Sequence, residues 1–160
     1  MGREREHGYD VTVRWTGAAE GGTTAYRAYS RDTETVAEGK PGPLPGSADP
    51  AFLGDAGRWN PEELLVASLS QCHMLSYLAL CAMRKIVVTA YEDVAHGTMA
   101  ESAGSGRFTE VVLNPVVTVA DAGMAETAAE LHDAAHRSCF IANSVSFPVR
   151  HRPTIRTAAA

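Results

Sequence analysis

Three cysteines carry the most direct chemical potential in this chain of 160 residues: Cys72, Cys81 and Cys139. A cysteine thiolate can attack a peroxide oxygen, which releases an alcohol and leaves a sulfenic acid on the sulfur. A second thiol can then condense with that sulfenic acid to form a disulfide. Such a pair needs an attacking cysteine with a lowered pKa and a second cysteine within reach. On spacing alone, the commoner alternative is that these are core cysteines, which pack as small hydrophobic residues.

Helical geometry limits which cysteines can meet. Cys72 lies in the middle of a predicted helix, and Cys81 follows nine residues later on the same helix. At about 100° per residue the two side chains point to opposite sides. A partner for Cys72 must therefore come from elsewhere in the chain, where Cys139 is the remaining cysteine. We interpret Cys81 as structural.

Histidines offer a weaker signal. His132 and His136 are four residues apart on a predicted helix, the spacing of paired metal ligands. The sequence has no HExxH motif and no third ligand close by, so two solvated histidines are the simpler interpretation. His73 follows Cys72 directly, but neighbours on a helix diverge and do not face each other. We therefore expect no metal, no cofactor and no histidine base beside Cys72.

The helix that holds Cys72 is predicted over 60–85. Asn60 is a good N-cap, Pro61 fits the first helical position, and Glu63 completes a pair that resembles a capping box. The segment is apolar nearly all the way round, which indicates a central helix buried on most sides. Polar and charged residues interrupt it, so it is not interpreted as a membrane span.

The remaining segments predict strands, a loop and a second helix. The irregular, proline-rich loop over 38–59 leads into the central helix, and we expect it to lie near a substrate, with a mobile surface excursion as the alternative. Before the central helix, the sequence predicts a hairpin of two strands, over 9–16 and 24–30, and a third short strand over 33–37. After it, the sequence predicts β-rich runs over 86–100 and 107–120, the second of them broken at 114–115. A helix over 122–137 and a final strand over 146–155 follow.

This order predicts an α+β fold in which antiparallel sheets pack around the long buried helix. The length fits a single domain over residues 1–160, with residues 1–8 and 156–160 expected to fray. A net charge of −5 argues against nucleic acid as a partner. The first ten residues have no apolar core and so do not predict a secretory signal, and three cysteines are too few for a secreted disulfide scaffold. We expect a cytoplasmic protein that does not enter a membrane.

The run NPEELLVASLSQC, which ends at Cys72, together with a second cysteine 67 positions later, resembles the OsmC/Ohr family of osmotically inducible and organic hydroperoxide resistance proteins. The resemblance extends over roughly residues 9–155. It implies an intertwined homodimer with the OsmC-like α+β fold. It also implies a thiol-dependent peroxidase for organic hydroperoxides in oxidative stress defence, with Cys72 as the peroxidatic and Cys139 as the resolving cysteine. A dithiol, such as one on a lipoylated protein, would reduce the disulfide.

The resemblance also implies a glutamate, here Glu62, paired with an arginine of the N-terminal hairpin that keeps the attacking cysteine as a thiolate. The Gly-rich turn GAAEGG lacks the arginine that the family usually has there, so Arg27 is the preferred substitute and Arg31 the second choice. Ten residues place Glu62 about 15 Å from Cys72 along one helix. Antiparallel central helices of a dimer would bring Glu62 of one protomer toward Cys72 of its partner.

A second departure is Phe140, which follows Cys139 where the family commonly has proline. It places the chain in a less characterised OsmC-like branch. The competing interpretation is a non-catalytic OsmC-fold binding or scaffold protein with buried structural cysteines. Cysteine-dependent acyl transfer is a weaker alternative, because it lacks a histidine partner. In the peroxidase interpretation, apolar neighbours of the cysteines would favour a peroxide with a hydrocarbon tail; the expected neighbours are Leu69, Met74, Tyr77 and Phe140.

Overall fold

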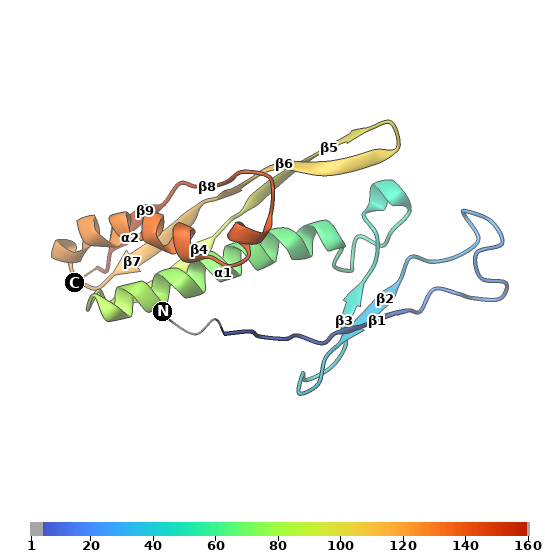
Figure 1. Ribbon diagram of the computed structural model, residues 1–160, viewed down its shortest axis with the longest axis horizontal. Helices are drawn as coiled ribbons and strands as arrows, with labels where there is room; N and C mark the ends of the chain where they lie inside the picture. The colour runs from blue at the N-terminus through green and yellow to red at the C-terminus, as the bar shows by residue number, and fades with distance from the viewer. Residues whose placement is uncertain (1–4, 160) are drawn as a thin grey trace. The chain divides into compact units, whose positions relative to one another are not determined.

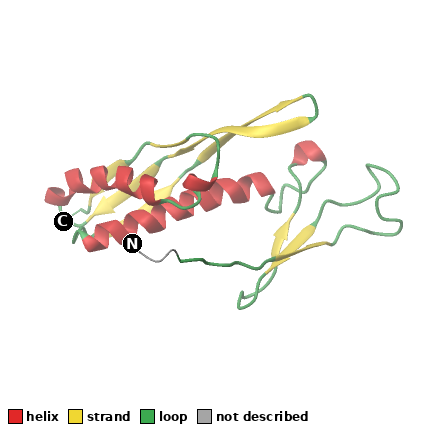
Figure 2. Ribbon diagram, in the orientation of Figure 1, coloured by secondary structure: helices red, strands yellow, loops and turns green. Residues whose placement is uncertain are grey.

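The computed structural model describes residues 5–159, which form two compact units divided at residue 64 (Figures 1 and 2). Each unit has its own sheet or sheets. The prediction of a single domain stays a prediction. Of the tails expected to fray, residues 1–4 and 160 lie outside the described residues, and residues 5–8 form no helix or strand.

The N-terminal unit is built on a three-stranded antiparallel sheet. Its strands β1 (Thr12–Trp15), β2 (Thr33–Val36) and β3 (Leu44–Gly46) pair in sequence order. The predicted strand over 24–30 is wrong, because that segment forms turns and β1 pairs directly with β2. The loop over 38–59 contains β3 and a short 3₁₀ helix, η1 (Pro50–Phe52).

The central helix α1 (Pro61–Met83) is confirmed within two residues at each end. Asn60 accepts the backbone N–H of Glu63 through its side chain at 2.8 Å, and Glu63 accepts the backbone N–H of Asn60 at 3.2 Å. This reciprocal pair is the capping box that the sequence predicts. The helix is long and apolar enough to cross a bilayer by length and composition, a test that core helices of soluble proteins also pass.

The burial of α1 corrects the prediction of a helix buried on most sides. Its buried residues recur every fourth position and form one stripe: Leu69, His73, Tyr77 and Cys81. Side chains four residues apart share a helix face, so one face packs into the chain. Other faces remain open in the single chain, where Leu75 is 57% and Met83 is 69% exposed.

The C-terminal unit contains two three-stranded sheets. One has the order β4 (Val88–Asp93), β7 (Pro115–Val119), β9 (Thr154–Thr157), and the other has the order β5 (His96–Ser102), β6 (Ser105–Leu113), β8 (Val149–His151). The chain passes from one sheet to the other between β4 and β5, between β6 and β7, and between β8 and β9. Figure 1 shows the long β5–β6 hairpin in yellow.

The α+β fold class is confirmed, but only the N-terminal sheet is antiparallel throughout, and the two sheets of the C-terminal unit are mixed. Strand β8 pairs parallel with β6, and β9 pairs parallel with β7. Thr157 pairs with Val119 at the end of β9, so the prediction that residues 156 and 157 fray is wrong. The break at Asn114 between β6 and β7 is confirmed.

The second long helix, α2 (Ala125–Ser138), packs beside α1 in one core. Asp121 caps a short 3₁₀ turn, η2 (Ala122–Met124), that leads into it. Buried residues of α1, β7 and α2 meet in a single apolar cluster. Its members are Tyr77, Cys81, Val117, Val119, Ala128, Leu131 and Ala135. After α2 the chain forms a 3₁₀ turn, η3 (Ala142–Ser144), before β8. Cys139 is therefore held at the point where α2 ends.

We predict that Asp93→Ala lowers the free energy of unfolding by about 1–3 kcal/mol, the cost of a buried donor without a partner. The Asp93 carboxylate accepts the backbone N–H of Asn114 at 2.6 Å and the hydroxyl of Ser70 at 2.5 Å, joining β4, the β6–β7 break and α1. Chemical denaturation at neutral pH and equal protein concentration measures the change. The control Asp93→Asn keeps an acceptor and should lose less; equal losses in both variants would contradict this account.

Candidate functional site

Two of the three cysteines meet in the C-terminal unit. Cys72 on α1 is partly exposed, and Cys139 directly after α2 is 1% exposed. The Cys72 thiol is one of the groups that raise the pKa of Cys139, which indicates that the two thiols lie near each other. All three cysteines are free thiols. Two reduced sulfurs in contact can be joined by a disulfide once one of them is oxidised.

The environment makes the two thiols unequal. Burial, followed by the hydrogen bond with Cys72, raises the pKa of Cys139 to about 11. The backbone N–H of Ala142 donates to the Cys139 sulfur at 3.5 Å, which lowers that pKa in part. A thiol with so high a pKa is protonated at neutral pH and is a poor first nucleophile. The arrangement therefore suits Cys72 as the attacking sulfur and Cys139 as the second one.

Cys81 lies apart from this pair. It belongs to the buried stripe of α1, where it packs in the core with Tyr77 and Val117. Burial raises the pKa of its thiol. Such a cysteine fits the structural role that the sequence predicts for it.

The apolar side chains expected around the cysteines divide into two groups. Leu69 and Tyr77 are fully buried in the two cores of the C-terminal unit, so they cannot line a path for a substrate. Phe140, the neighbour of Cys139, is 76% exposed. Of the expected lining residues, Phe140 and the partly buried Met74 remain accessible.

Arg27 and Glu62 belong to the N-terminal unit, and no ion pair joins them among residues 5–159. Arg27 lies in the turns between β1 and β2 and is exposed. Glu62 lies in the first turn of α1, and one of its carboxylate oxygens is buried without a hydrogen-bond partner in the described part of the chain. A buried carboxylate oxygen without a donor is the acceptor that an arginine side chain would satisfy.

Arg31 is the arginine of this loop that local contacts hold in place. Its guanidinium carbon lies 4.0 Å from the ring centroid of Tyr29 and 4.6 Å from that of Tyr26. The same group donates to the backbone carbonyl of Tyr29 at 2.6 Å and to that of Tyr26. The sequence signal for this arrangement is an arginine that follows two aromatic residues, two and five positions earlier. The preference for Arg27 did not take this signal into account.

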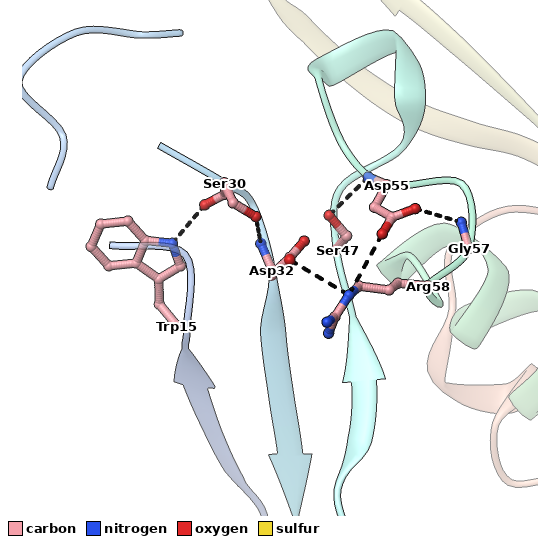
Figure 3. A network of polar contacts seen from close by, with 7 residues as sticks. All are labelled: Trp15, Ser30, Asp32, Ser47, Asp55, Gly57 and Arg58. Atoms are coloured by element: carbon pink, nitrogen blue, oxygen red, sulfur yellow. Dashed lines mark hydrogen bonds and ion pairs between the residues drawn. The ribbon is translucent and has the colours of Figure 1, made fainter. Parts of the chain in front are cut away.

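A polar network fixes the loops of the N-terminal unit to each other (Figure 3). The indole N–H of Trp15 donates to the carbonyl of Ser30 at 2.8 Å, and the Ser30 hydroxyl accepts the N–H of Asp32 at 3.1 Å. Arg58 lies 3.6 Å from Asp32 and 3.7 Å from Asp55, measured from its Nε to carboxylate oxygens. The loop that leads into α1 is therefore tied to the loop that carries Arg27 and Arg31.

A buried histidine pair is the feature of this unit that the sequence interpretation missed. His73 on α1 and His132 on α2 are hydrogen-bonded between Nε2 and Nδ1 at 3.0 Å. Both side chains are fully buried, so the interpretation of His132 as solvated is wrong. The available signal was position: His73 shares a face with Leu69 and Tyr77, and such a face packs inward. No group of three side chains in residues 5–159 is arranged to hold a metal ion.

The family described as OsmC-like protein matches residues 54–153. An OsmC-like protein of unknown function from Vibrio cholerae is 30% identical, with a TM-score of 0.83 over 93% of this chain and 100% of that one. No curated protein sequence is similar enough to count as a match.

Two structures named for organic hydroperoxide resistance share the fold at lower identity. One, from Legionella pneumophila, is 14% identical with a TM-score of 0.66 over 96% of this chain and 99% of that one. The other, OhrB of Bacillus subtilis, is 18% identical with a TM-score of 0.60 over 94% and 98%. The resemblance carried by the NPEEL segment and the two cysteines is thus confirmed, and the chain belongs to the OsmC-like protein family.

Proposed function

We propose that this protein is a thiol-dependent peroxidase that reduces organic hydroperoxides to alcohols through a Cys72–Cys139 disulfide. The observation that carries the proposal is the proximity of the two thiols, one partly exposed and one buried. Two relatives of the same fold carry organic hydroperoxide resistance in their names, which supports this substrate class. The exposed Phe140 beside Cys139 offers apolar surface to a peroxide with a hydrocarbon tail.

The first step consumes the peroxide. The Cys72 thiolate attacks one peroxide oxygen, so that an S–O bond forms and the O–O bond breaks. The other oxygen leaves with the electron pair of that bond, takes a proton and becomes the alcohol. Cys72 is then a sulfenic acid, oxidised by two electrons, and the hydroperoxide has been reduced by two electrons.

The second step forms the disulfide. The Cys139 sulfur attacks the Cys72 sulfenic acid, the S–S bond forms and the S–O bond breaks. The departing hydroxide takes the thiol proton of Cys139 and leaves as water. The raised pKa of Cys139 keeps that proton on the sulfur until the attack. A dithiol reductant, such as one on a lipoylated protein, then returns both cysteines to the thiol form.

Activation of Cys72 requires a cation near its sulfur. In this proposal Arg27 stabilises the thiolate and Glu62 orients the arginine, with its buried, unpartnered carboxylate oxygen as the acceptor. The working unit is a homodimer, which the exposed apolar residues of α1, Leu75 and Met83, support. We place the protein in the cytoplasm, where reducing dithiols can recycle a disulfide. No nucleic acid, membrane, metal or cofactor takes part in this cycle.

A non-catalytic binding or scaffold protein with structural cysteines is the second candidate. The burial of Cys139 and its pKa of about 11 favour it, because inert cysteines share both features. Under this alternative, cumene hydroperoxide would leave the thiols of Cys72 and Cys139 reduced. Under the peroxidase proposal, one equivalent of peroxide would convert them into a disulfide, which mass spectrometry of the intact protein detects as a loss of two hydrogens.

We predict that Cys72→Ser abolishes the consumption of cumene hydroperoxide with dihydrolipoamide as the reductant, because it removes the sulfur that becomes oxidised. The matched control Cys81→Ser should keep nearly full activity, since Cys81 lies in the core away from Cys139. Steady-state rates with cumene hydroperoxide, tert-butyl hydroperoxide and hydrogen peroxide measure both effects. Activity that survives in Cys72→Ser would rule out the proposed cycle.

We predict that Arg27→Gln lowers the rate of peroxide reduction by about tenfold to a hundredfold, the loss of one hydrogen bond to a charged group. Arg31→Gln is the comparison, because Arg31 is held by Tyr26 and Tyr29 and serves the loop itself. Single-turnover rates of Cys72 oxidation separate activation from recycling. A large loss in Arg31→Gln with none in Arg27→Gln would assign the activating role to Arg31 instead.

A further inference from the structure

The His73–His132 pair joins the two helices that carry the reactive cysteines. His73 lies on α1 directly after Cys72, and His132 lies on α2 seven residues before Cys139. Seven helical residues span about 10 Å, or two turns. The imidazole pair thus connects the two helices close to the place where the two thiols lie near each other. The second connection limits how α2, and Cys139 at its end, can move against α1.

Two hydrogen-bonding groups of this pair have no partner in the described chain. Each neutral imidazole has one N–H and one acceptor nitrogen. Whichever ring donates in the central bond, one of the outer nitrogens, His73 Nδ1 or His132 Nε2, carries a hydrogen and the other a lone pair. Both outer nitrogens are buried without hydrogen-bond partners in the described chain. A buried polar atom without a partner lowers the stability of the fold. The histidine pair therefore carries an energetic penalty that apolar residues at the same positions would avoid.

The surroundings supply little to neutralise a charge on the pair. From α1, Tyr77 stacks on His132 with ring centroids 3.9 Å apart. Two other side chains lie beside Tyr77: Cys81 of the same helix and Tyr91 of β4. From β8, the ring of His151 lies 5.5 Å from that of His73. From α2, His136 lies against His151, and Arg137 adds a positive charge near His136.

The carboxylate of this neighbourhood is already engaged. Asp133 of α2 lies 2.8 Å from His151, and its side chain is 71% exposed. Asp133 raises the pKa of His132, but it is the smallest of the influences on that pKa. The other groups named around the pair are neutral or basic. A proton added to His73 or His132 therefore lacks a counter-charge.

We propose that the His73–His132 hydrogen bond is an acid-labile positioning contact that holds Cys139 against Cys72 and releases it when the histidines become charged. The effect on turnover rests on the peroxidase function proposed above. The contact itself concerns the placement of Cys139, which can be measured without a peroxide. His73 and His132 are positioning residues here, because they act through the helices and not on the reacting sulfurs.

Protonation breaks the contact in two stages. A first proton leaves the central bond in place but puts an uncompensated charge in the core, which is unfavourable. A second proton places hydrogens on both facing nitrogens and abolishes the bond. Burial lowers the pKa of His73 to about 4 and that of His132 to about 3, with neighbouring histidines adding to the shift.

The sign of the pH effect follows from these values. An opened or unfolded segment has histidines near the ordinary pKa of 6.5, so it binds more protons than the closed form. The closed form therefore keeps its full stability above about pH 6.5 and loses it as the pH falls toward 4. Between pH 7 and pH 5 the two histidines together favour opening by about a hundredfold or more.

The test is the rate at which 4,4′-dithiodipyridine labels Cys139 in the full-length protein between pH 7.5 and 4.5. Peptide mass mapping assigns the label, and glutathione measured in parallel corrects for the reagent's own pH dependence. We expect the corrected rate to rise about a hundredfold or more from pH 7 to pH 5, because the buried sulfur becomes accessible. A flat corrected rate in the wild-type protein would overturn the proposal without any variant.

The matched variant is the double substitution His73→Gln/His132→Asn. A glutamine amide can replace the Nε2 position and an asparagine amide the Nδ1 position, so a neutral hydrogen bond survives but cannot take a proton. We expect this variant to label like the wild-type protein at pH 7.5 and to lose the acid-dependent rise. The control His96→Asn removes an exposed histidine of β5 and should keep the rise. An unchanged rise in the double variant would overturn the assignment to this pair.

Failure of the peroxidase proposal would look different. If peroxide consumption is absent but labelling of Cys139 still rises in acid, the positioning contact stands and the function does not. If peroxide is consumed but labelling does not depend on pH, the function stands and the contact does not. Hydrogen exchange at the C-terminal end of α2, followed on the wild-type protein across the same pH range, provides a second readout that should rise with the labelling.

Discussion

The packing of one face of α1 against α2 and the sheets is the constraint on which the C-terminal unit depends. Four residues at every fourth position, from Leu69 to Cys81, bury that face in two neighbouring cores. Because helix rotation is fixed by this stripe, residues one position away are turned by about 100°. Cys72 precedes a member of the stripe and is thereby kept at the edge of the core, partly exposed and near Cys139. A sulfur buried in the stripe, as Cys81 is, would be protected from any substrate.

This constraint also makes the two sulfurs of the contact unequal. Cys139 ends α2 inside the core, and its burial raises its pKa, whereas Cys72 keeps access to solvent. Disulfide chemistry benefits from such asymmetry, because the attacking sulfur must meet a peroxide and the second sulfur must meet only the first. In the proposed cycle, the roles would divide between a cysteine in mid-helix and one placed where a helix stops.

Local signals in the sequence predict much of this structure; one prediction failed for a local reason and the others for nonlocal ones. The cap at Asn60 and the proline after Asn114 act on their own neighbours, so α1 and the β6–β7 break were predictable. The expected strand over 24–30 failed because Arg31 uses the carbonyls of that segment, which a sheet would need. The parallel partners of β8 and β9 are distant in the chain, as are His73 and His132, which are 59 residues apart. No periodicity reports contacts of that kind.

The histidine pair shows why the site needs more than two sulfurs in contact. A thiol contact alone is a weak tie, since S–H groups donate and accept poorly. Apolar packing around α2 resists separation but does not fix how far its end lies from α1. The Nε2 to Nδ1 bond of 3.0 Å supplies a directional contact with a set length. It does so one residue from Cys72, where a small displacement matters most for two sulfurs that must approach bonding distance. Its two unpartnered nitrogens are an energetic burden in the core, and the precision it gives the thiol contact is a physical reason for retaining it.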